Sequence, residues 1–284
     1  MISFRQFIIF ICLNITSTTS IAQPYVDLFS VQGVLTKSDD IVSNHKYNVN
    51  TDFLSVQLSY PHQFKNKSIL VVSSGYDKWN LSSTAGESNL ETGYLPVTFI
   101  KPFSQKWKCS LTAIPRFNRE RGRTFDQATM QWGGAFIATR ILSPHFIVKA
   151  GLYYNKEFFG NYFLPLIGGE WKPNERMSIF GLLPNNLFID YKLSETIHTG
   201  FVFKGITASF RLKVTNNYDY IRMEEGQFKF FADFYVKKNI VINIEAGHTL
   251  KREYGFGFLN KESTSAEFND GYLLKAGIYY RLWL

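Results

Sequence analysis

The side chains that most readily exchange protons near neutral pH are five histidines: His45, His62, His145, His198 and His248. Most of them fall in or beside turn-rich polar stretches, where a solvent-exposed histidine is expected. The chain has no G-x-S-x-G, H-E-x-x-H or C-x-x-C sequence and no phosphate-binding glycine loop. The sequence therefore predicts a protein that is not an enzyme and that holds no metal or cofactor.

His248 is the one histidine that could do chemistry. The alternation of its segment points it outward near the external end of a predicted strand, where a lipid-modifying barrel enzyme would present a histidine. No serine on a neighbouring predicted strand accompanies it as a nucleophile. We therefore interpret His248 as an interfacial residue and keep a lipid-modifying enzyme as an alternative.

Alternation with a period of two residues organises most of the chain. In residues 240–250, Ile240, Ile242 and Ile244 lie on one face, and Asn243 and Glu245 lie on the other. The polar faces of such segments carry charges that a sandwich core would leave unpaired. Because a barrel in lipid needs one wholly apolar outer face, the pattern favours an all-β transmembrane barrel over a soluble β-sandwich.

The connections between these segments alternate in length, as in an antiparallel up-and-down barrel in the outer membrane. Short turns at 61–66, 104–106, 142–145, 173–176, 194–196 and 237–239 alternate with mostly longer polar stretches at 37–50, 82–92, 118–126, 156–161, 216–225 and 253–270. About 14 strands result, with 12 as the alternative. The apolar parity changes near Gly205, which predicts a bulge there. The predicted spans are 25–35, 50–60, 67–81, 93–103, 107–117, 128–141, 146–156, 161–172, 177–183, 187–193, 197–213, 226–236, 240–252 and 272–283.

The side chains that the strand alternation points inward include both acidic and basic groups, and the basic groups are more numerous. A barrel of about 14 strands is too wide for side chains alone to fill. One interpretation is a water-filled lumen that passes small solutes with a mild preference for anions, and the other is a plugged barrel crossed by salt bridges. The inward-facing residues are Gln57, Lys149, Asp190, Lys192, Lys204, Arg211, Lys229, Asp233, Asn243, Glu245, Lys275 and Arg281.

Basic residues are spread through the chain, so the net charge of +8 does not indicate a nucleic-acid partner. The densest group is Arg116, Arg119, Arg121 and Arg123, at a predicted external loop and strand end. Guanidinium groups bind phosphate in a forked geometry, so these arginines are candidates to bind the phosphates of lipopolysaccharide. A merely solvated loop is the other interpretation.

The first 22 residues have the layout of a cleavable signal peptide: an early Arg5, an apolar run and small residues before Gln23. The apolar run is too short to span a bilayer as a helix. Cleavage would leave residues 23–284 as one barrel domain with the single cysteine Cys109 and no disulfide. Both mature termini are then expected on the periplasmic side of a bacterial outer membrane.

The chain ends on an apolar strand in which Lys275, Gly277, Tyr280 and Leu282 are suitably spaced. This pattern resembles the C-terminal β-signal by which outer-membrane proteins of Gram-negative bacteria are recognised by the barrel-assembly machinery. The chain departs from the family pattern because Leu284 follows the terminal aromatic residue Trp283.

Residues 168–186, GGEWKPNERMSIFGLLPNN, together with the Ala22–Gln23 junction and the chain length, resemble an uncharacterised outer-membrane β-barrel family common in Bacteroidota. The resemblance covers nearly the whole mature chain and implies a fold and a location, but no activity. The sequence thus predicts a porin-like pore or transport protein that contacts outer-membrane lipid. A closed barrel that serves as a surface binding or structural protein is the alternative.

Overall fold

The alternating segments form β-strands throughout the computed structural model, which describes residues 25–38, 47–83, 86–214 and 217–283. The predicted signal peptide lies outside the described residues. Within these residues no helix is long and apolar enough to cross a membrane. The elements are β1 (Tyr25–Ser38), β2 (Val49–Gln63), β3 (Ile69–Ser83), β4 (Gly86–Tyr94), β5 (Val97–Pro102), β6 (Trp107–Glu120), η1 (Gln127–Thr129), β7 (Met130–Ser143), β8 (Phe146–Glu157), β9 (Gly160–Asn174), β10 (Met177–Leu183), β11 (Asn186–Lys192), β12 (Ile197–Arg211), β13 (Tyr220–Lys237), β14 (Ile240–Phe258), β15 (Lys261–Phe268) and β16 (Gly271–Trp283).

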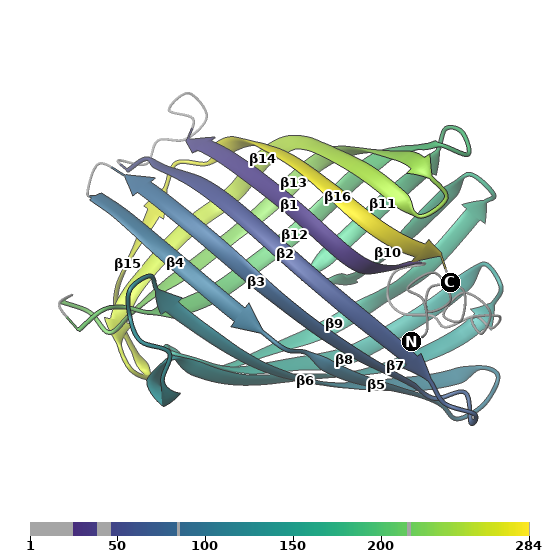
Figure 1. Ribbon diagram of the computed structural model, residues 1–284, viewed down its shortest axis with the longest axis horizontal. Coiled ribbons are helices and arrows are strands. Elements are labelled where there is room, and N and C mark those ends of the chain that lie inside the picture. The colour runs from purple at the N-terminus through teal and green to yellow at the C-terminus, as the bar shows by residue number, and fades with distance from the viewer. Residues whose placement is uncertain (1–24, 39–46, 84–85, 215–216, 284) are drawn as a thin grey trace, which may run out of the picture.

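These strands close into an antiparallel barrel (Figure 1). Both β4 and β5 pair with β3 and with β6, so they are two halves of one wall strand. Strand β15 pairs with β14 and extends beyond the wall. The 16 strands therefore make a wall of 16 − 1 − 1 = 14, and the predicted strand number is confirmed. The first and last strands pair with each other, and Tyr25 lies opposite Trp283.

The described chain thus begins and ends at one end of the barrel, which we call the terminal end; the opposite end is the distal end. Three of the connections at the terminal end are closed by the same device. The side-chain oxygens of Ser104, Asn174 and Ser194 each accept hydrogen bonds from the backbone N–H groups two and three residues further along. Polar side chains that bind nearby backbone in this way favour tight turns.

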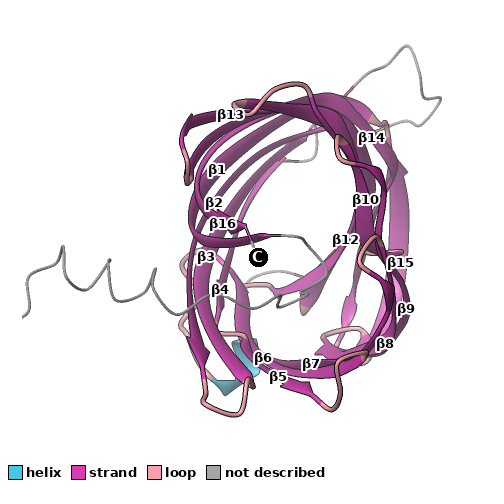
Figure 2. Cartoon of the chain, turned by 90° about the vertical axis from the view of Figure 1, so that its right-hand side faces the viewer, coloured by secondary structure: helices cyan, strands magenta, loops and turns pink. Residues whose placement is uncertain are grey.

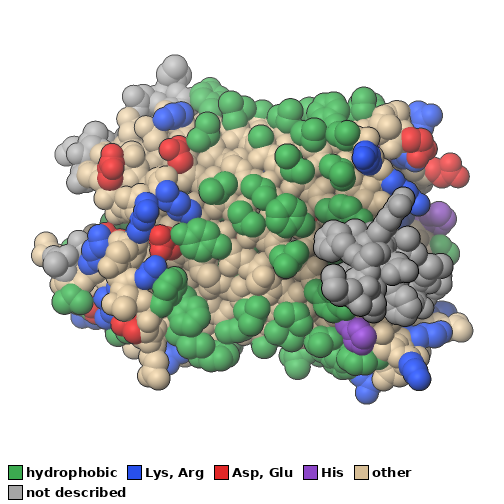
Figure 3. All heavy atoms as spheres, in the orientation of Figure 1, with side chains coloured by type: hydrophobic (Ala, Val, Ile, Leu, Met, Phe, Trp, Pro, Cys, Tyr) green, Lys and Arg blue, Asp and Glu red, His purple; other side chains and the backbone are tan. Residues whose placement is uncertain are grey.

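The outer surface carries a broad belt of large apolar side chains (Figure 3). Ile167 on β9 is 65% exposed, and Leu111, Trp132 and Leu274 are similarly exposed on other strands. An exposed apolar surface of this extent is unfavourable in water and matches the hydrocarbon of a bilayer. The barrel is therefore built to lie in a membrane.

Two predicted external loops are largely strand. Residues 82–92 were expected as a loop, but most of them lie at the end of β3 and in β4, which form a hairpin above the wall. Residues 253–270 were likewise expected as a loop, but they form the end of β14, β15 and their turn. The prediction was wrong because polar strands that rise beyond the membrane no longer need one apolar face, so the alternation that signals a strand is lost.

The bulge predicted near Gly205 is also absent. Strands β12 and β13 stay in one register from Ile197 opposite Phe234 to Arg211 opposite Tyr220. The ladder between β13 and β14 instead shifts near Lys251, whose φ of 53° is left-handed. The inward face of β14 therefore changes from odd residues, such as Glu245, to even ones, such as Arg252.

The apolar parity changes in β12 because its distal part passes inside the barrel. Arg211 of β12 pairs with Arg119 of β6, a strand of the opposite wall. An apolar cluster then joins the two walls, and we call it the distal seal. Its members are Val49, Trp79, Leu81 and Leu90 from β2, β3 and β4, and Phe210, Leu212, Ile221, Met223 and Tyr254 from the β12–β14 side.

A buried polar group continues the distal seal toward β6, β7 and β8. The Ser209 hydroxyl donates to Glu157 at 2.5 Å and accepts hydrogen bonds from Gln131 Nε2 at 2.9 Å and from the Phe158 N–H at 3.0 Å. The Asn118 amide donates to the Ser209 carbonyl at 2.8 Å. Viewed from the terminal end, the barrel is oval and β12 crosses its interior (Figure 2).

If the distal seal stabilises the barrel, Phe210→Ala should lower the free energy of unfolding by about 3 kcal/mol, because it opens a cavity at a fully buried site. Urea unfolding of the refolded protein in vesicles measures this change. Val214→Ala, at a side chain that is 90% exposed, is the control and should change the free energy little. Equal losses in both variants would contradict a packed seal.

Candidate functional site

The lumen of the barrel holds two adjoining cavities. The central cavity, of about 440 Å³, lies against β1, β2, β13, β14 and β16. The side cavity, of about 470 Å³, lies against the inner face of β3 to β10 and the distal part of β12. Phe53, Trp79, Lys204 and Ile206 line both, so these four side chains form the constriction between the two cavities.

Two groups of ion pairs lie along the wall of the central cavity formed by β13, β14, β16 and β1. Glu245 accepts hydrogen bonds from Lys275 Nζ at 2.6 Å and forms an ion pair with Lys229 Nζ at 2.7 Å. Arg281 forms ion pairs with Asp233 at 2.6 Å and Asp27 at 2.8 Å. Burial of these groups requires such pairing, because an unpaired charge away from bulk water is costly.

The lining of the central cavity is balanced in charge. It includes four basic residues, Lys204, Lys229, Lys275 and Arg281, and four acidic ones, Asp27, Glu225, Asp233 and Glu245, so the formal sum is 4 − 4 = 0. The excess of basic groups expected from the sequence is therefore not found in this cavity. Within the described part of the chain, Lys204 makes no ion pair, unlike Lys229, Lys275 and Arg281.

Eight of the twelve residues expected to face inward line the central cavity. They are Gln57, Lys204, Lys229, Asp233, Asn243, Glu245, Lys275 and Arg281. Lys149 is buried on β8 and lines neither cavity. Asp190 and Lys192 line a third cavity, of about 820 Å³, at the terminal mouth, where Asp190 lies 3.1 Å from His198 Nδ1.

Arg211 is the exception to the parity prediction. Without a bulge in β12, it lies on the face opposite to Lys204, and it lines neither lumen cavity. That face of distal β12 turns toward β7 and β8, where Ser209 is hydrogen-bonded, and Arg211 forms an ion pair with Asp219 at 3.2 Å. The assignment of Arg211 to the lumen was wrong because it depended on the bulge.

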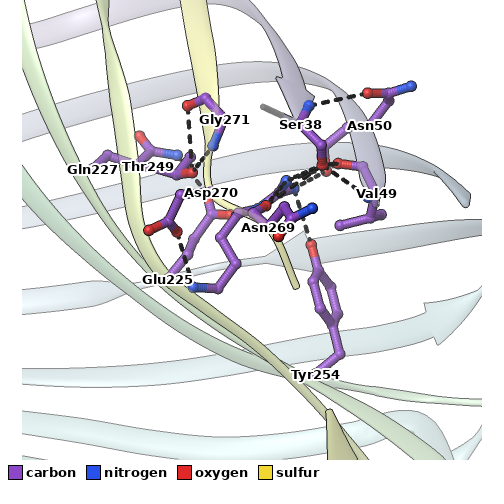
Figure 4. A network of polar contacts seen from close by, with 12 residues as sticks. Ser38, Val49, Asn50, Glu225, Gln227, Thr249, Tyr254, Asn269, Asp270 and Gly271 are labelled. Atoms are coloured by element: carbon purple, nitrogen blue, oxygen red, sulfur yellow. Dashed lines mark hydrogen bonds and ion pairs between the residues drawn. The ribbon is translucent and has the colours of Figure 1, made fainter. Parts of the chain in front are cut away.

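Arg252 is an important residue that the sequence analysis missed. It is buried and donates to the Val49 carbonyl at 2.7 Å and to Thr51 Oγ1 at 2.9 Å, and it pairs with Glu225 at 3.3 Å. Several of its partners are labelled in Figure 4, where they come from the distal parts of separate strands. Arg252 therefore joins β14 to β2 at the distal end. Only the bulge at Lys251 turns it inward, and nothing in the alternation of the sequence indicates that bulge.

Three of the four clustered arginines are engaged inside the protein. Arg116 lines the side cavity and pairs with Glu157, Arg119 pairs with Glu91 at 3.0 Å, and Arg123 donates to the Leu212 carbonyl at 2.8 Å. Arg121 differs, because its side chain is 61% exposed. Binding of lipopolysaccharide phosphate stays a prediction, and among the four it now depends chiefly on Arg121.

His248 and the C-terminal pattern have structural surroundings of their own. His248 is half-buried, with Nδ1 2.6 Å from the Thr249 carbonyl and its ring edge-on to Tyr272. In β16, a Cβ at Gly277 would lie 2.8 Å from the Tyr279 ring, whose hydroxyl donates to Gln32 at 2.7 Å. Gly277 thus makes room for the ring of Tyr279 of the same strand, which reaches across to Gln32 of β1. Recognition of β16 by an assembly machinery stays a prediction.

Comparison with known families gives one assignment. A family described as a domain of unknown function, DUF6268, matches residues 37–281. The chain belongs to the DUF6268 family. This agrees with the expected resemblance to an uncharacterised barrel family. No curated protein sequence matches the chain.

Several solved barrels resemble this DUF6268 protein at low identity. A NanC porin is 8% identical, with a TM-score of 0.44, over 89% of this chain and all of its own. The COG4313 outer membrane channel from Pseudomonas putida F1 is 9% identical, with a TM-score of 0.47, over 90% and 96% of the two chains. The translocator domain of autotransporter NalP from Neisseria meningitidis is 9% identical, with a TM-score of 0.39, over 98% and 94%. At this similarity we draw no conclusion about function from them.

Removal of the shared carboxylate in the central cavity should destabilise this DUF6268 barrel. Glu245→Gln leaves Lys229 and Lys275 without a counter-charge, and the expected loss of unfolding free energy is about 3 kcal/mol. Urea unfolding in vesicles measures it, with Glu87→Gln on an exposed part of β4 as the control. A loss no larger than that of the control would mean that water in the lumen solvates both lysines.

Arg121→Ala should weaken binding of isolated lipopolysaccharide to the detergent-solubilised protein, because it removes an exposed guanidinium near the distal end. Arg176→Ala, in a turn at the terminal end, is the matched control and should leave binding unchanged. Binding that is the same for both variants and the unmodified protein would exclude a phosphate site at Arg121.

Proposed function

We propose that this protein is an integral outer-membrane transport barrel that passes small solutes through its lumen. One observation supports this most directly: the central and side cavities adjoin and share four lining residues. The third cavity, at the terminal mouth, follows the central cavity along the barrel. Its lining includes Tyr235, which lies on the inward face of β13 two residues beyond Asp233 of the central cavity. Space for a solute therefore extends along most of the barrel.

The outer membrane is the location that this architecture favours. A closed barrel with an apolar belt is the β-structure that satisfies all backbone hydrogen bonds in a bilayer. Short turns at the end that carries both termini fit the periplasmic side, and the extended distal parts of β13 and β14, with the β14–β15 hairpin, fit the cell exterior. The distal seal would then lie at the outer end and act as the gate.

Two contacts would control such a pore. The distal seal closes the axial path, because Phe210 and Leu212 pack against Leu81 and Leu90 of the opposite wall. Lys204 lines the constriction without an ion pair among the described residues, so its charge would act directly on a passing ion. Without Lys204 the lining of the central cavity would sum to 3 − 4 = −1, so this lysine would strongly influence ion preference.

Single-channel conductance in a planar bilayer tests the proposal. We expect discrete current steps from the unmodified protein, and more frequent openings from Phe210→Ala/Leu212→Ala, in which the seal is trimmed. A bilayer that stays silent with both proteins, after insertion has been verified, would contradict a pore. That outcome would instead favour a closed barrel with a binding or structural role.

Lys204→Glu should move the reversal potential in a KCl gradient toward the potassium equilibrium potential, because it replaces a cation at the constriction with an anion. Lys65→Glu, in the exposed turn between β2 and β3, makes the same charge change away from all three cavities and is the control. A similar shift for both variants would contradict the assignment of the constriction to Lys204.

A further inference from the structure

The wall of the barrel is incomplete at one place. Strands β10 and β11 have 7 residues each, whereas their neighbours β9 and β12 have 15 each. The last ladder pairs are Leu183 with Ile167 and Asn186 with Lys204. Residues 160–166 of β9 therefore have no ladder partner in β10. On the β11 side, residues 206–210 of β12 have no ladder partner among the described residues, whereas the Gly205 N–H donates to the Asn185 carbonyl at 2.8 Å and Arg211 pairs with Arg119 of β6. We call the gap between these two edges the side notch.

The side notch lies at the level of the apolar belt. Phe163 of β9 is four residues beyond the last pair with β10, and its exposed ring packs against Tyr154 of β8 with the centroids 4.9 Å apart. Leu183, at the tip of the short hairpin, is also exposed. The belt thus continues past the tip of β10 and β11, so in a bilayer the notch would face hydrocarbon and not water.

The side cavity begins at the side notch. Leu166 and Leu182 line it from the β9 and β10 edge, and Gly205, Ile206 and Thr207 line it from the β12 edge. Residues from both faces of β12 take part, since Ile206 and Thr207 point to opposite sides of the strand. The cavity therefore reaches around the free edge of β12, where the wall strand β11 has ended.

The lining of the side cavity suits an apolar guest. Beyond the notch residues, Phe53, Trp79, Ile114, Ile137 and Phe210 supply most of its apolar wall, and Asp77, Thr92, Asn118 and Asn185 add polar groups. A pocket with largely apolar walls and a small number of placed polar groups suits apolar and aromatic ligands. Arg116, the cation on its wall, is already bound to Glu157, while Lys204 lies at the inner end where the cavity meets the central one.

We propose that the side notch is a lateral portal through which small apolar molecules, aromatic ones included, exchange between the bilayer and the side cavity. The distal seal blocks the axial exit, whereas no strand crosses the notch among the described residues. This inference rests on the proposed solute path through the lumen and adds the place where it meets the membrane and the class of ligand.

Trp79 offers a test, because it lines the side cavity and the central cavity and is almost wholly buried. A variant that keeps Trp79 alone, with Phe in place of Trp107, Trp132, Trp171 and Trp283, would be refolded into vesicles. Its fluorescence would be quenched either by 1-bromonaphthalene dissolved in the bilayer or by acrylamide in the water. A second single-tryptophan variant with Trp132, which is exposed on the outer belt, is the positive control for the bilayer quencher.

The portal predicts that 1-bromonaphthalene quenches Trp79. Ala208→Phe in the same background fills part of a cavity of about 470 Å³ and should lower the quenching slope about twofold or more. Ala246→Phe makes the same change on the exposed outer face of β14 and should leave the slope unchanged. If Ala208→Phe fails to give a heat-modifiable folded band on a gel, Thr207→Phe, at the same edge, takes its place.

Three outcomes would overturn the portal. Quenching of Trp79 by acrylamide but not by 1-bromonaphthalene would leave the water-filled lumen standing and exclude the lateral route. Quenching by 1-bromonaphthalene that neither filling variant lowers would mean that the quencher acts through the wall from outside. No quenching of Trp79 by either reagent would contradict both the portal and the proposed solute path.

Discussion

A peptide group in hydrocarbon finds no water to bind, and this constraint governs the whole structure. Every strand at membrane depth needs a partner on both sides, so the first and last strands must pair and the sheet must close. Among the residues that the structure describes, the wall strands run out above the short hairpin of β10 and β11. There β12 turns into the lumen, where Asn118 and Arg119 of β6 contact Ser209 and Arg211.

This inward turn makes the lumen asymmetric. The same segment of β12 that leaves the wall supplies Phe210 to the distal seal and Ile206 to the side cavity. An apolar outer half therefore adjoins a charged inner half, and Lys204 marks the boundary. In the charged half almost every cation has a carboxylate partner, which limits the cost of holding charges away from bulk water.

Burial and lipid exposure select the same residue types, and this explains most differences between the sequence and the structure. Phe201 faces the bilayer and Phe210 faces the opposite wall, although both are phenylalanine. Where the lumen is packed, an apolar residue of a barrel strand can face either the lipid or the interior, so its residue type does not show its orientation. The change of apolar parity in β12 therefore predicts a bulge that the structure does not contain. The bulge that does occur in β14 is not visible in the hydrophobic pattern of the sequence.

The class of fold, the number of wall strands and the inward orientation of residues such as Lys229, Glu245 and Lys275 follow from the amino-acid sequence, because alternation with period two is a local property of each strand. Contacts of the folded chain are what bury Arg252, place Arg116 on the side cavity, seal the distal end and set the side cavity beside a notch. These features depend on contacts between strands far apart in the chain, and on the lengths of β10 and β11 relative to their neighbours. No local pattern encodes such distances.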